Sequence, residues 1–177
     1  MNTVTEAKPS VTPFFHAPTG TWTYVVADPA SRAAAVIDPV LDYDWRSGRT
    51  GTKSADTLVA HCASERLEVA WILETHAHAD HLSAAPYLKS RLGGRIAIGR
   101  GILQVQATFK RIFGLGADFA ADGSQFDALL ADGDRIDLGA IPGQVIAAPG
   151  HTSDSVAYLV GDALFVGDTV FMPDGGS

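Results

Sequence analysis

The feature that most constrains this chain is a dense histidine cluster at residues 75–81, Thr-His-Ala-His-Ala-Asp-His. Three of the six histidines of the chain lie in this segment. Imidazole and carboxylate groups are the usual nitrogen and oxygen ligands of zinc and ferrous iron. The segment follows an apolar run at residues 69–73 that predicts a buried strand, and it precedes a helix predicted from Ser83. The cluster therefore predicts metal ligands in a strand-to-helix loop, where open α/β sheets tend to place their sites.

The composition indicates a folded domain and argues against several classes of partner. The chain has 177 residues, 46% of them hydrophobic and 19% charged, which suffices for one domain with a substantial core. Its net charge of −7 predicts binding neither to nucleic acid nor to an anionic membrane surface. Cys62 is the single cysteine, so no intrachain disulfide is expected. With no signal peptide or membrane span predicted, we expect a cytoplasmic protein.

Local patterns predict a chain that is rich in strands, with three helices. Residues 1–12 are expected to form a flexible N-terminal tail, and residues 13–177 one domain. Strands are predicted at residues 14–15, 21–27, 33–37, 69–73, 95–98, 134–138, 144–148, 156–160 and 163–166. Helices are predicted at residues 54–66, 83–92 and 101–113, and surface loops at residues 42–53 and 114–127.

Two further loops at predicted strand ends carry ligand-type residues. Pro149-Gly150-His151-Thr152 follows one strand, and Gly167-Asp168-Thr169 follows another. A lone histidine or turn aspartate is more often structural, so His151 and Asp168 gain their weight from the motifs beside them. The complete candidate set is His76, His78, Asp80, His81, His151 and Asp168.

The other histidines, the cysteine and one further aspartate are interpreted as structural residues. His16 and His61 are taken as non-ligands, and Cys62 as a small buried apolar residue. Asp38, which precedes Pro39, is taken as a turn residue, with a role around the metal ligands as the alternative.

The order of these three motifs resembles that of the metallo-β-lactamase superfamily. Residues 37–43, 74–84 and 167–174 are similar to its sulfur (persulfide) dioxygenase branch, which includes the β-lactamase hydrolase-like proteins and is related to glyoxalase II. The resemblance covers roughly residues 14 to 175. It implies an α+β fold, a four-layer αββα sandwich with the metal at one edge of the two sheets. Since family chains normally continue well past Gly-Asp-Thr, the second half is expected to be truncated.

The resemblance implies two alternative ligand assignments. In the persulfide dioxygenases, one ferrous ion is held by the equivalents of His76, His151 and Asp168, a facial triad with open positions. The three remaining candidates would then orient ligands or substrate from outside the ligand shell. In the dinuclear zinc members, the first zinc ion would be held by His76, His78 and His151. Asp80 and His81 would hold the second, and Asp168 would bridge. Asp80 is also the expected catalytic residue.

Three functions follow as hypotheses. The favoured one is oxidation of glutathione persulfide, or a similar small-molecule persulfide, to sulfite by dioxygen at a single Fe(II) per chain. The alternative is a Zn(II)-dependent hydrolase of thioesters or related esters, in which the metals lower the pKa of water. The third is a truncated, weakly active metal-binding module. A homodimer is a further expectation, because truncation would leave a sheet edge that invites pairing.

Overall fold

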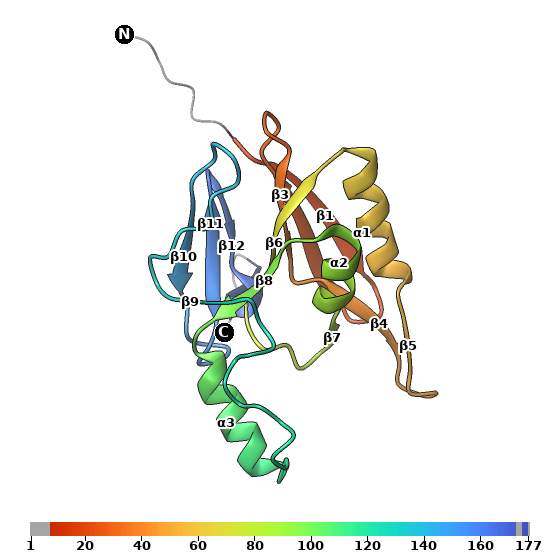
Figure 1. Ribbon diagram of the computed structural model, residues 1–177, viewed down its shortest axis with the longest axis vertical. Coiled ribbons are helices and arrows are strands. Elements are labelled where there is room, and N and C mark those ends of the chain that lie inside the picture. The colour runs from red at the N-terminus through yellow and green to blue at the C-terminus, as the bar shows by residue number, and fades with distance from the viewer. Residues whose placement is uncertain (1–7, 173–174, 177) are drawn as a thin grey trace.

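The computed structural model describes residues 8–172 and 175–176, and its centre is a six-stranded sheet (Figure 1). The strand order is β1–β2–β3–β6–β8–β9. The bounds are β1 (Ser10–His16), β2 (Thr21–Ala27), β3 (Ala33–Ile37), β6 (Glu68–Glu74), β8 (Arg95–Gly99) and β9 (Ala128–Leu130). β1, β2 and β3 pair antiparallel, whereas β3, β6, β8 and β9 run parallel. The carboxyl ends of these parallel strands therefore meet at one edge of the sheet.

The six-stranded sheet is covered on both faces. On one face lie α1 (Lys53–Ser64) and α2 (Ala85–Leu92), which bury Leu58 and Leu88 against the sheet residues Val36 and Ile72. On the other face lies an antiparallel sheet of β10 (Gly143–Ala147), β11 (Val156–Val160) and β12 (Ala163–Phe165). Tyr158 of β11 is fully buried in the core between the sheets. The described residues thus form three of the expected four layers: helices, large sheet and small sheet (Figure 1).

The remaining elements lie around the edges of these layers. β4 (Val40–Asp44) pairs with β5 (Arg49–Gly51) and with β7 (Leu82–Ser83). A short 3₁₀ helix η1 (Gly167–Thr169) precedes a two-stranded ribbon of β13 (Val170–Met172) and β14 (Gly175–Gly176). α3 (Ile102–Ile112) projects from the lower end of the molecule in Figure 1. Within the described part of the chain, every helix is too short or too polar to cross a membrane. The cytoplasmic location stays a prediction.

Most predicted elements are confirmed, including the three helices and the hairpin of β2 and β3. The predicted N-terminal tail is wrong for residues 10–12, since these residues pair with β2 as the start of β1. Residues 1–7 lie outside the described residues, as do Pro173 and Asp174 of the last resembling segment.

Two further predictions, a loop at residues 42–53 and a strand at residues 134–138, are wrong in part. Residues 42–53 are not one loop but contain the β4–β5 hairpin, whose turn is closed by bonds from Arg46 N and Ser47 Oγ to Asp44. This hairpin is polar because much of it is exposed, so apolar periodicity could not reveal it. The predicted strand at residues 134–138 forms only isolated bridges, at Arg135 and Leu138, while β9 was not predicted.

Candidate metal centre

The histidine loop starts where β6 ends, directly beside the end of β3. Ile37 and Leu73 are paired in register, so the following residues, Asp38 and Glu74, emerge side by side. Asp38 adopts a positive φ of 51° and is buried. Its Oδ1 accepts a hydrogen bond from Thr75 N (2.7 Å), and its Oδ2 accepts one from Thr75 Oγ1 (2.8 Å). These two bonds fix the backbone and side chain of the residue that precedes the first histidine.

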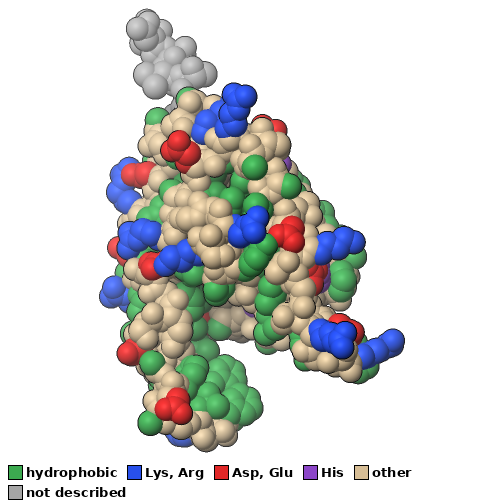
Figure 2. All heavy atoms as spheres, turned by 45° about the vertical axis from the view of Figure 1, so that its right-hand side comes forward, with side chains coloured by type: hydrophobic (Ala, Val, Ile, Leu, Met, Phe, Trp, Pro, Cys, Tyr) green, Lys and Arg blue, Asp and Glu red, His purple; other side chains and the backbone are tan. Residues whose placement is uncertain are grey.

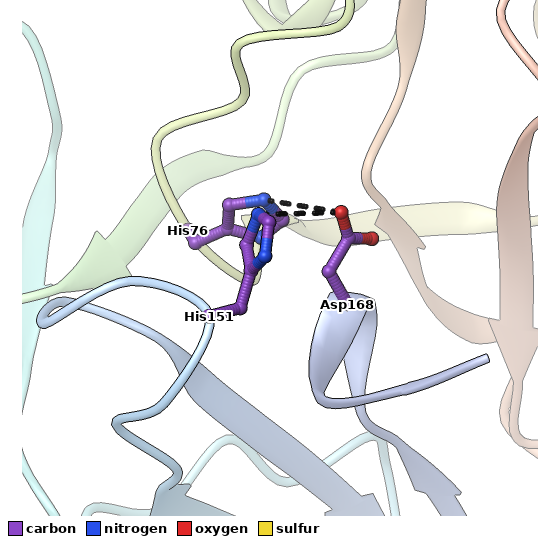
Figure 3. Close-up of side chains that lie close together, drawn as sticks. All are labelled: His76, His151 and Asp168. Atoms are coloured by element: carbon purple, nitrogen blue, oxygen red, sulfur yellow. Dashed lines mark ion pairs between the residues drawn. The ribbon is translucent and has the colours of Figure 1, made fainter. Parts of the chain in front are cut away.

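One group of candidate ligands is assembled from three separate loops. His76 follows β6, His151 lies in the loop after β10, and Asp168 lies in η1 after β12. In Figure 3 the two imidazoles converge on the Asp168 carboxylate, with Nε2 of His76 at 3.9 Å and Nε2 of His151 at 3.4 Å from Oδ2. One ligand atom from each residue lies within 4.8 Å of the others. Distances of this size leave room for one ion between the three side chains.

Thr75 also sets the orientation of the His76 ring. Nδ1 of His76 lies 3.0 Å from Thr75 Oγ1, whose own proton is donated to Asp38. The hydroxyl therefore accepts from Nδ1–H, which leaves the lone pair of His76 on Nε2. That Nε2 atom is buried and has no hydrogen-bond partner among the described residues. Burial lowers the pKa of His76, so the ring is held in the neutral form that binds metal.

A close backbone approach brings Asp168 to this ring. Gly167 has a φ of +51°, and a Cβ at this position would lie 2.4 Å from Thr75 Oγ1. Only glycine lets η1 approach Thr75 this closely. Across the site, Asp154 Oδ2 accepts a hydrogen bond from Ala77 N (3.0 Å), and Val156 N donates to Thr75 O (2.9 Å). One side-chain bond and one backbone bond therefore connect β11 and the residues before it to the histidine loop.

The second group consists of the neighbouring residues His78, Asp80 and His81, whose ligand atoms also lie within 4.8 Å of one another. The rings of His78 and His81 stack with centroids 4.2 Å apart. Thr21 Oγ1 donates to Asp80 Oδ2 (2.8 Å), while Nδ1–H of His81 donates to the Leu82 carbonyl (3.1 Å). Nε2 of His81 is buried without a hydrogen-bond partner in the described part of the chain. Each member could thus offer a ligand atom, but His78 differs from the other two.

His78 is held by two buried carboxylates. Its Nε2 lies 3.0 Å from Asp38 Oδ1 and 3.3 Å from Glu74 Oε2. Burial alone would lower the pKa of His78, but the two carboxylates outweigh it and raise the pKa to about 11. Nδ1, which lies 3.9 Å from Asp80 Oδ1, is the atom that His78 would offer to a metal in this second group, and binding there must release a proton. The second group is therefore less ready for a metal than the first.

The chemistry of the first group fits a metal ion. It offers two imidazole nitrogens and a carboxylate oxygen, and it includes a buried, unpartnered nitrogen. Two histidines and one carboxylate suit non-haem ferrous iron, although zinc accepts the same atoms. All six predicted ligands thus fall into two adjoining groups.

Several residues that surround the candidate ligands were not expected from the sequence. Asp38 is not simply a turn residue, and Glu74, Thr75 and Asp154 were not singled out. One signal could have found Asp38, since it follows a predicted strand in the same way as the histidine cluster does. Glu74 also accepts from Ser83 Oγ, so it connects the two ends of the histidine loop.

Two cavities border the histidine loop. The larger, of about 570 Å³, is lined by Trp22, Tyr24, Asp80 and Asp168 among others. The smaller, of about 250 Å³, has a wall of mainly apolar residues that includes Ile98, Ile102 and Phe126, and it also touches His76, His78 and His81. The site is therefore accessible from two directions.

Comparison with known proteins places this geometry in a family. The profile described as the metallo-beta-lactamase superfamily matches residues 16–177. The chain belongs to the metallo-β-lactamase superfamily. The α+β sandwich described above is this superfamily's fold, and the histidine, Pro-Gly-His-Thr and Gly-Asp-Thr motifs all lie inside the matched region.

The superfamily relatives carry names from more than one branch. A probable metallo-hydrolase of Burkholderia pseudomallei (strain 1710b) is 52% identical over 93% of this chain and 59% of its own length. A mitochondrial persulfide dioxygenase, ETHE1, of Bos taurus is 30% identical over 86% of this chain and 49% of its own length. The crystal structure of ETHE1 from Myxococcus xanthus superposes with a TM-score of 0.69 at 29% identity, covering 92% of this chain and 59% of the other. The chain thus spans about half to three-fifths of the length of these relatives.

Proposed function

We propose that this chain carries the iron centre of a persulfide dioxygenase, which oxidises glutathione persulfide or a similar small persulfide to sulfite. The observation that carries the proposal is the first ligand group, in which His76, His151 and Asp168 converge from three loops with the His76 lone pair already directed inward. A facial triad of this composition is typical of ferrous oxygenases. The likeness to ETHE1 supports the same choice.

The protein groups would bind and orient the ion rather than carry out redox chemistry themselves. His76, His151 and Asp168 would hold the ion, and bound ferrous iron would supply the redox chemistry and the open positions for dioxygen and sulfur. Thr75 fixes the His76 tautomer, and Asp38 fixes Thr75. Support of this kind around the ligands holds a metal site in its productive geometry.

Asp80 is the proposed catalytic residue, acting as an acceptor of protons on the substrate side. It lines the larger cavity, and the hydrogen bond from Thr21 fixes one of its oxygens. Burial would raise the pKa of Asp80, but this hydrogen bond and the nearby histidines lower it, so the carboxylate stays ionised. In the overall reaction the outer sulfur gains two oxygen atoms from dioxygen and one from water. The products are sulfite, the free thiol and two protons. Asp80 is placed to accept a proton that is released there.

A second candidate is a zinc-dependent hydrolase of thioesters or related esters. The observation that favours it is the second group, His78, Asp80 and His81, which could take another ion. The name of the Burkholderia relative also supports it. In this function zinc ions held by these side chains would lower the pKa of water and so supply the nucleophile for the carbonyl carbon. The requirement for a proton to leave His78 makes this the weaker candidate.

Metal analysis of protein purified without added metal separates the two functions. The dioxygenase predicts about one iron per chain, whereas two zinc ions per chain would contradict it and support the hydrolase. Anaerobic loading with ferrous iron and, separately, with zinc would show which ion saturates at a single site.

Oxygen uptake after addition of glutathione persulfide is the functional test. Uptake should vanish in His76→Ala, His151→Ala and Asp168→Ala, while a Trp45→Ser variant, changed on the exposed β4–β5 hairpin, serves as the control. Hydrolysis of a glutathione thioester without oxygen uptake would support the second candidate. Bound metal with neither activity would indicate the metal-binding module.

A further inference from the structure

A chain of four side-chain hydrogen bonds runs from the histidine loop to β4. At one end, Thr21 Oγ1 donates to Asp80 Oδ2 (2.8 Å), and Thr19 Oγ1 donates to Thr21 Oγ1 (2.9 Å). At the other end, His16 Nδ1 lies 2.8 Å from Thr19 Oγ1, and His16 Nε2 lies 3.3 Å from Asp42 Oδ1. The three middle residues belong to the tip of the β1–β2 hairpin. The hairpin tip is therefore connected to two segments that are distant from it in sequence.

Chemistry fixes the direction of the bonds in this chain. The Asp80 carboxylate can only accept, so the single hydroxyl proton of Thr21 is donated to it. The hydroxyl proton of Thr19 is donated to Thr21 in turn, so the ring nitrogen beside Thr19 must be a donor. Nδ1 of His16 therefore carries a proton. Each hydroxyl keeps its orientation only while the donor before it is present.

The turn between β1 and β2 does not depend on these side-chain bonds. Its backbone is closed by Thr19 N and Gly20 N, which donate to the His16 carbonyl at 3.3 and 2.9 Å. The ladder of β1 and β2 also ends in the backbone pair of His16 and Thr21. Since the backbone already defines this turn, the side-chain bonds are available for another role, and their course toward Asp80 indicates which one.

The far end of the hydrogen-bond chain is anchored away from the candidate metal centre. Asp42 accepts bonds from Ser54 N (2.8 Å) and Ser54 Oγ (2.6 Å), in the first turn of α1. The His16 side chain is 10% exposed, and little histidine surface of any kind is visible on the face that Figure 2 draws. His16 lines two other depressions, whereas Thr19 and Asp80 line the larger cavity beside the metal centre. A change at His16 therefore reaches this cavity through Thr19.

We propose that His16 and Thr19 are positioning residues for Asp80. They fix the direction of the Thr21 hydroxyl, which holds Oδ2 of this carboxylate. The other oxygen, Oδ1, then stays on the side of His78, 3.9 Å from its Nδ1. A general base must be held within hydrogen-bond reach of the proton that it accepts. The inference deepens the proposed function and rests on it only for the step in which Asp80 accepts a proton.

Nuclear magnetic resonance of the full chain after metal removal tests the positioning without any activity. Three-bond couplings between the α and β protons of Asp80 should report one χ1 rotamer in the native chain and averaged rotamers in Thr19→Val and His16→Leu. Thr19→Ser keeps the hydroxyl, and His16→Asn keeps an N–H donor near the place of Nδ1, so both should retain the single rotamer. Averaged couplings in the native chain, or unchanged couplings in Thr19→Val and His16→Leu, would overturn the proposal.

Oxygen uptake by the iron-loaded chain tests the consequence for catalysis. His16→Leu should lower kcat about 10-fold, the size of effect expected when an outer partner of a site residue is lost. Its KM for the persulfide should stay near the native value, because His16 acts on Asp80 rather than on the bound substrate. His16→Asn should recover most of the lost kcat, and Thr12→Val, elsewhere in β1, is the control that should leave kcat unchanged. Equal losses in both His16 variants would indicate a merely structural role and overturn the proposal.

The two measurements separate this inference from the proposed function. Couplings that respond as expected, in a chain that takes up no oxygen with glutathione persulfide, would support the positioning of Asp80 and contradict the dioxygenase. Oxygen uptake in a chain whose Asp80 couplings ignore Thr19→Val and His16→Leu would support the dioxygenase and contradict the positioning.

Discussion

The two ligand groups use similar side chains but are built in opposite ways. His76, His151 and Asp168 come from three loops that only the tertiary structure brings together, whereas His78, Asp80 and His81 are neighbours in sequence. The separated group has a neutral, inward-facing nitrogen on His76. The contiguous group includes His78, which two carboxylates hold as a cation. A high local density of histidine and aspartate therefore does not show that a segment is in the protonation state that binds metal. The hydrogen bonds around each histidine set that state.

Removing one ligand from each group is the strongest test of this difference. His76→Ala should lower the affinity for ferrous iron more than about 100-fold, beyond the effect of losing an outer partner of a ligand. His81→Ala should change it about 10-fold or less, because in the favoured assignment this ring only surrounds the site. Competition with a metal-binding dye measures both. Equal losses would show that the two groups bind metal together.

Removing the buried carboxylate beside both groups should destabilise the fold. Asp38→Ala leaves His78 and the donors of Thr75 without their partner, which should lower the free energy of unfolding by about 3–5 kcal/mol. Asp38→Asn keeps an acceptor and tolerates the positive φ, so it should cost about 1–2 kcal/mol. Urea unfolding with a chelator present measures both variants. A similar small cost in both would mean that the Asp38 cluster contributes little.

Gly167 tests whether close packing positions the Asp168 ligand. Gly167→Ala would press a methyl group against Thr75 at a positive φ, which should cost about 2–4 kcal/mol and weaken metal binding. Gly114→Ala is the matched control, because its φ is +59° but nothing lies within 4 Å of the added Cβ. It should cost only the backbone strain, about 1–2 kcal/mol. Unchanged metal affinity in Gly167→Ala would contradict the idea that the close approach of Gly167 to Thr75 positions Asp168.

A further prediction concerns the pH dependence of stability without metal. The pKa of His78 is raised in the folded protein to about 11, above its ordinary value near 6.5. The folded state therefore binds the proton more tightly, and the stability it gains is complete below that ordinary value and declines as pH rises toward 11. The urea midpoint should fall from pH 7 to pH 10 more steeply in the native chain than in His78→Gln. Parallel profiles would contradict the cationic form of His78.

Much of the architecture followed from local patterns, because core strands and helices carry strong periodicity. The runs that became β2, β3 and β6 were predicted, as were all three helices, and the larger errors concern the start of β1, β9 and the polar β4–β5 hairpin. These segments are short, exposed or at a sheet edge, where burial imposes no alternation of apolar and polar residues. All six candidate ligands were likewise predicted, because they lie in loops that follow predicted strands.

The sequence by itself determined the superfamily and the six candidate ligands, because the three motifs are short and each is complete in its own loop. Only the tertiary structure decided how the ligands divide and which groups hold them. Asp38 reaches His78 because β3 and β6 run parallel and in register, and Gly167 reaches Thr75 because the small sheet packs on the large one. Such contacts join residues far apart in the chain, and no local pattern encodes which of them will meet.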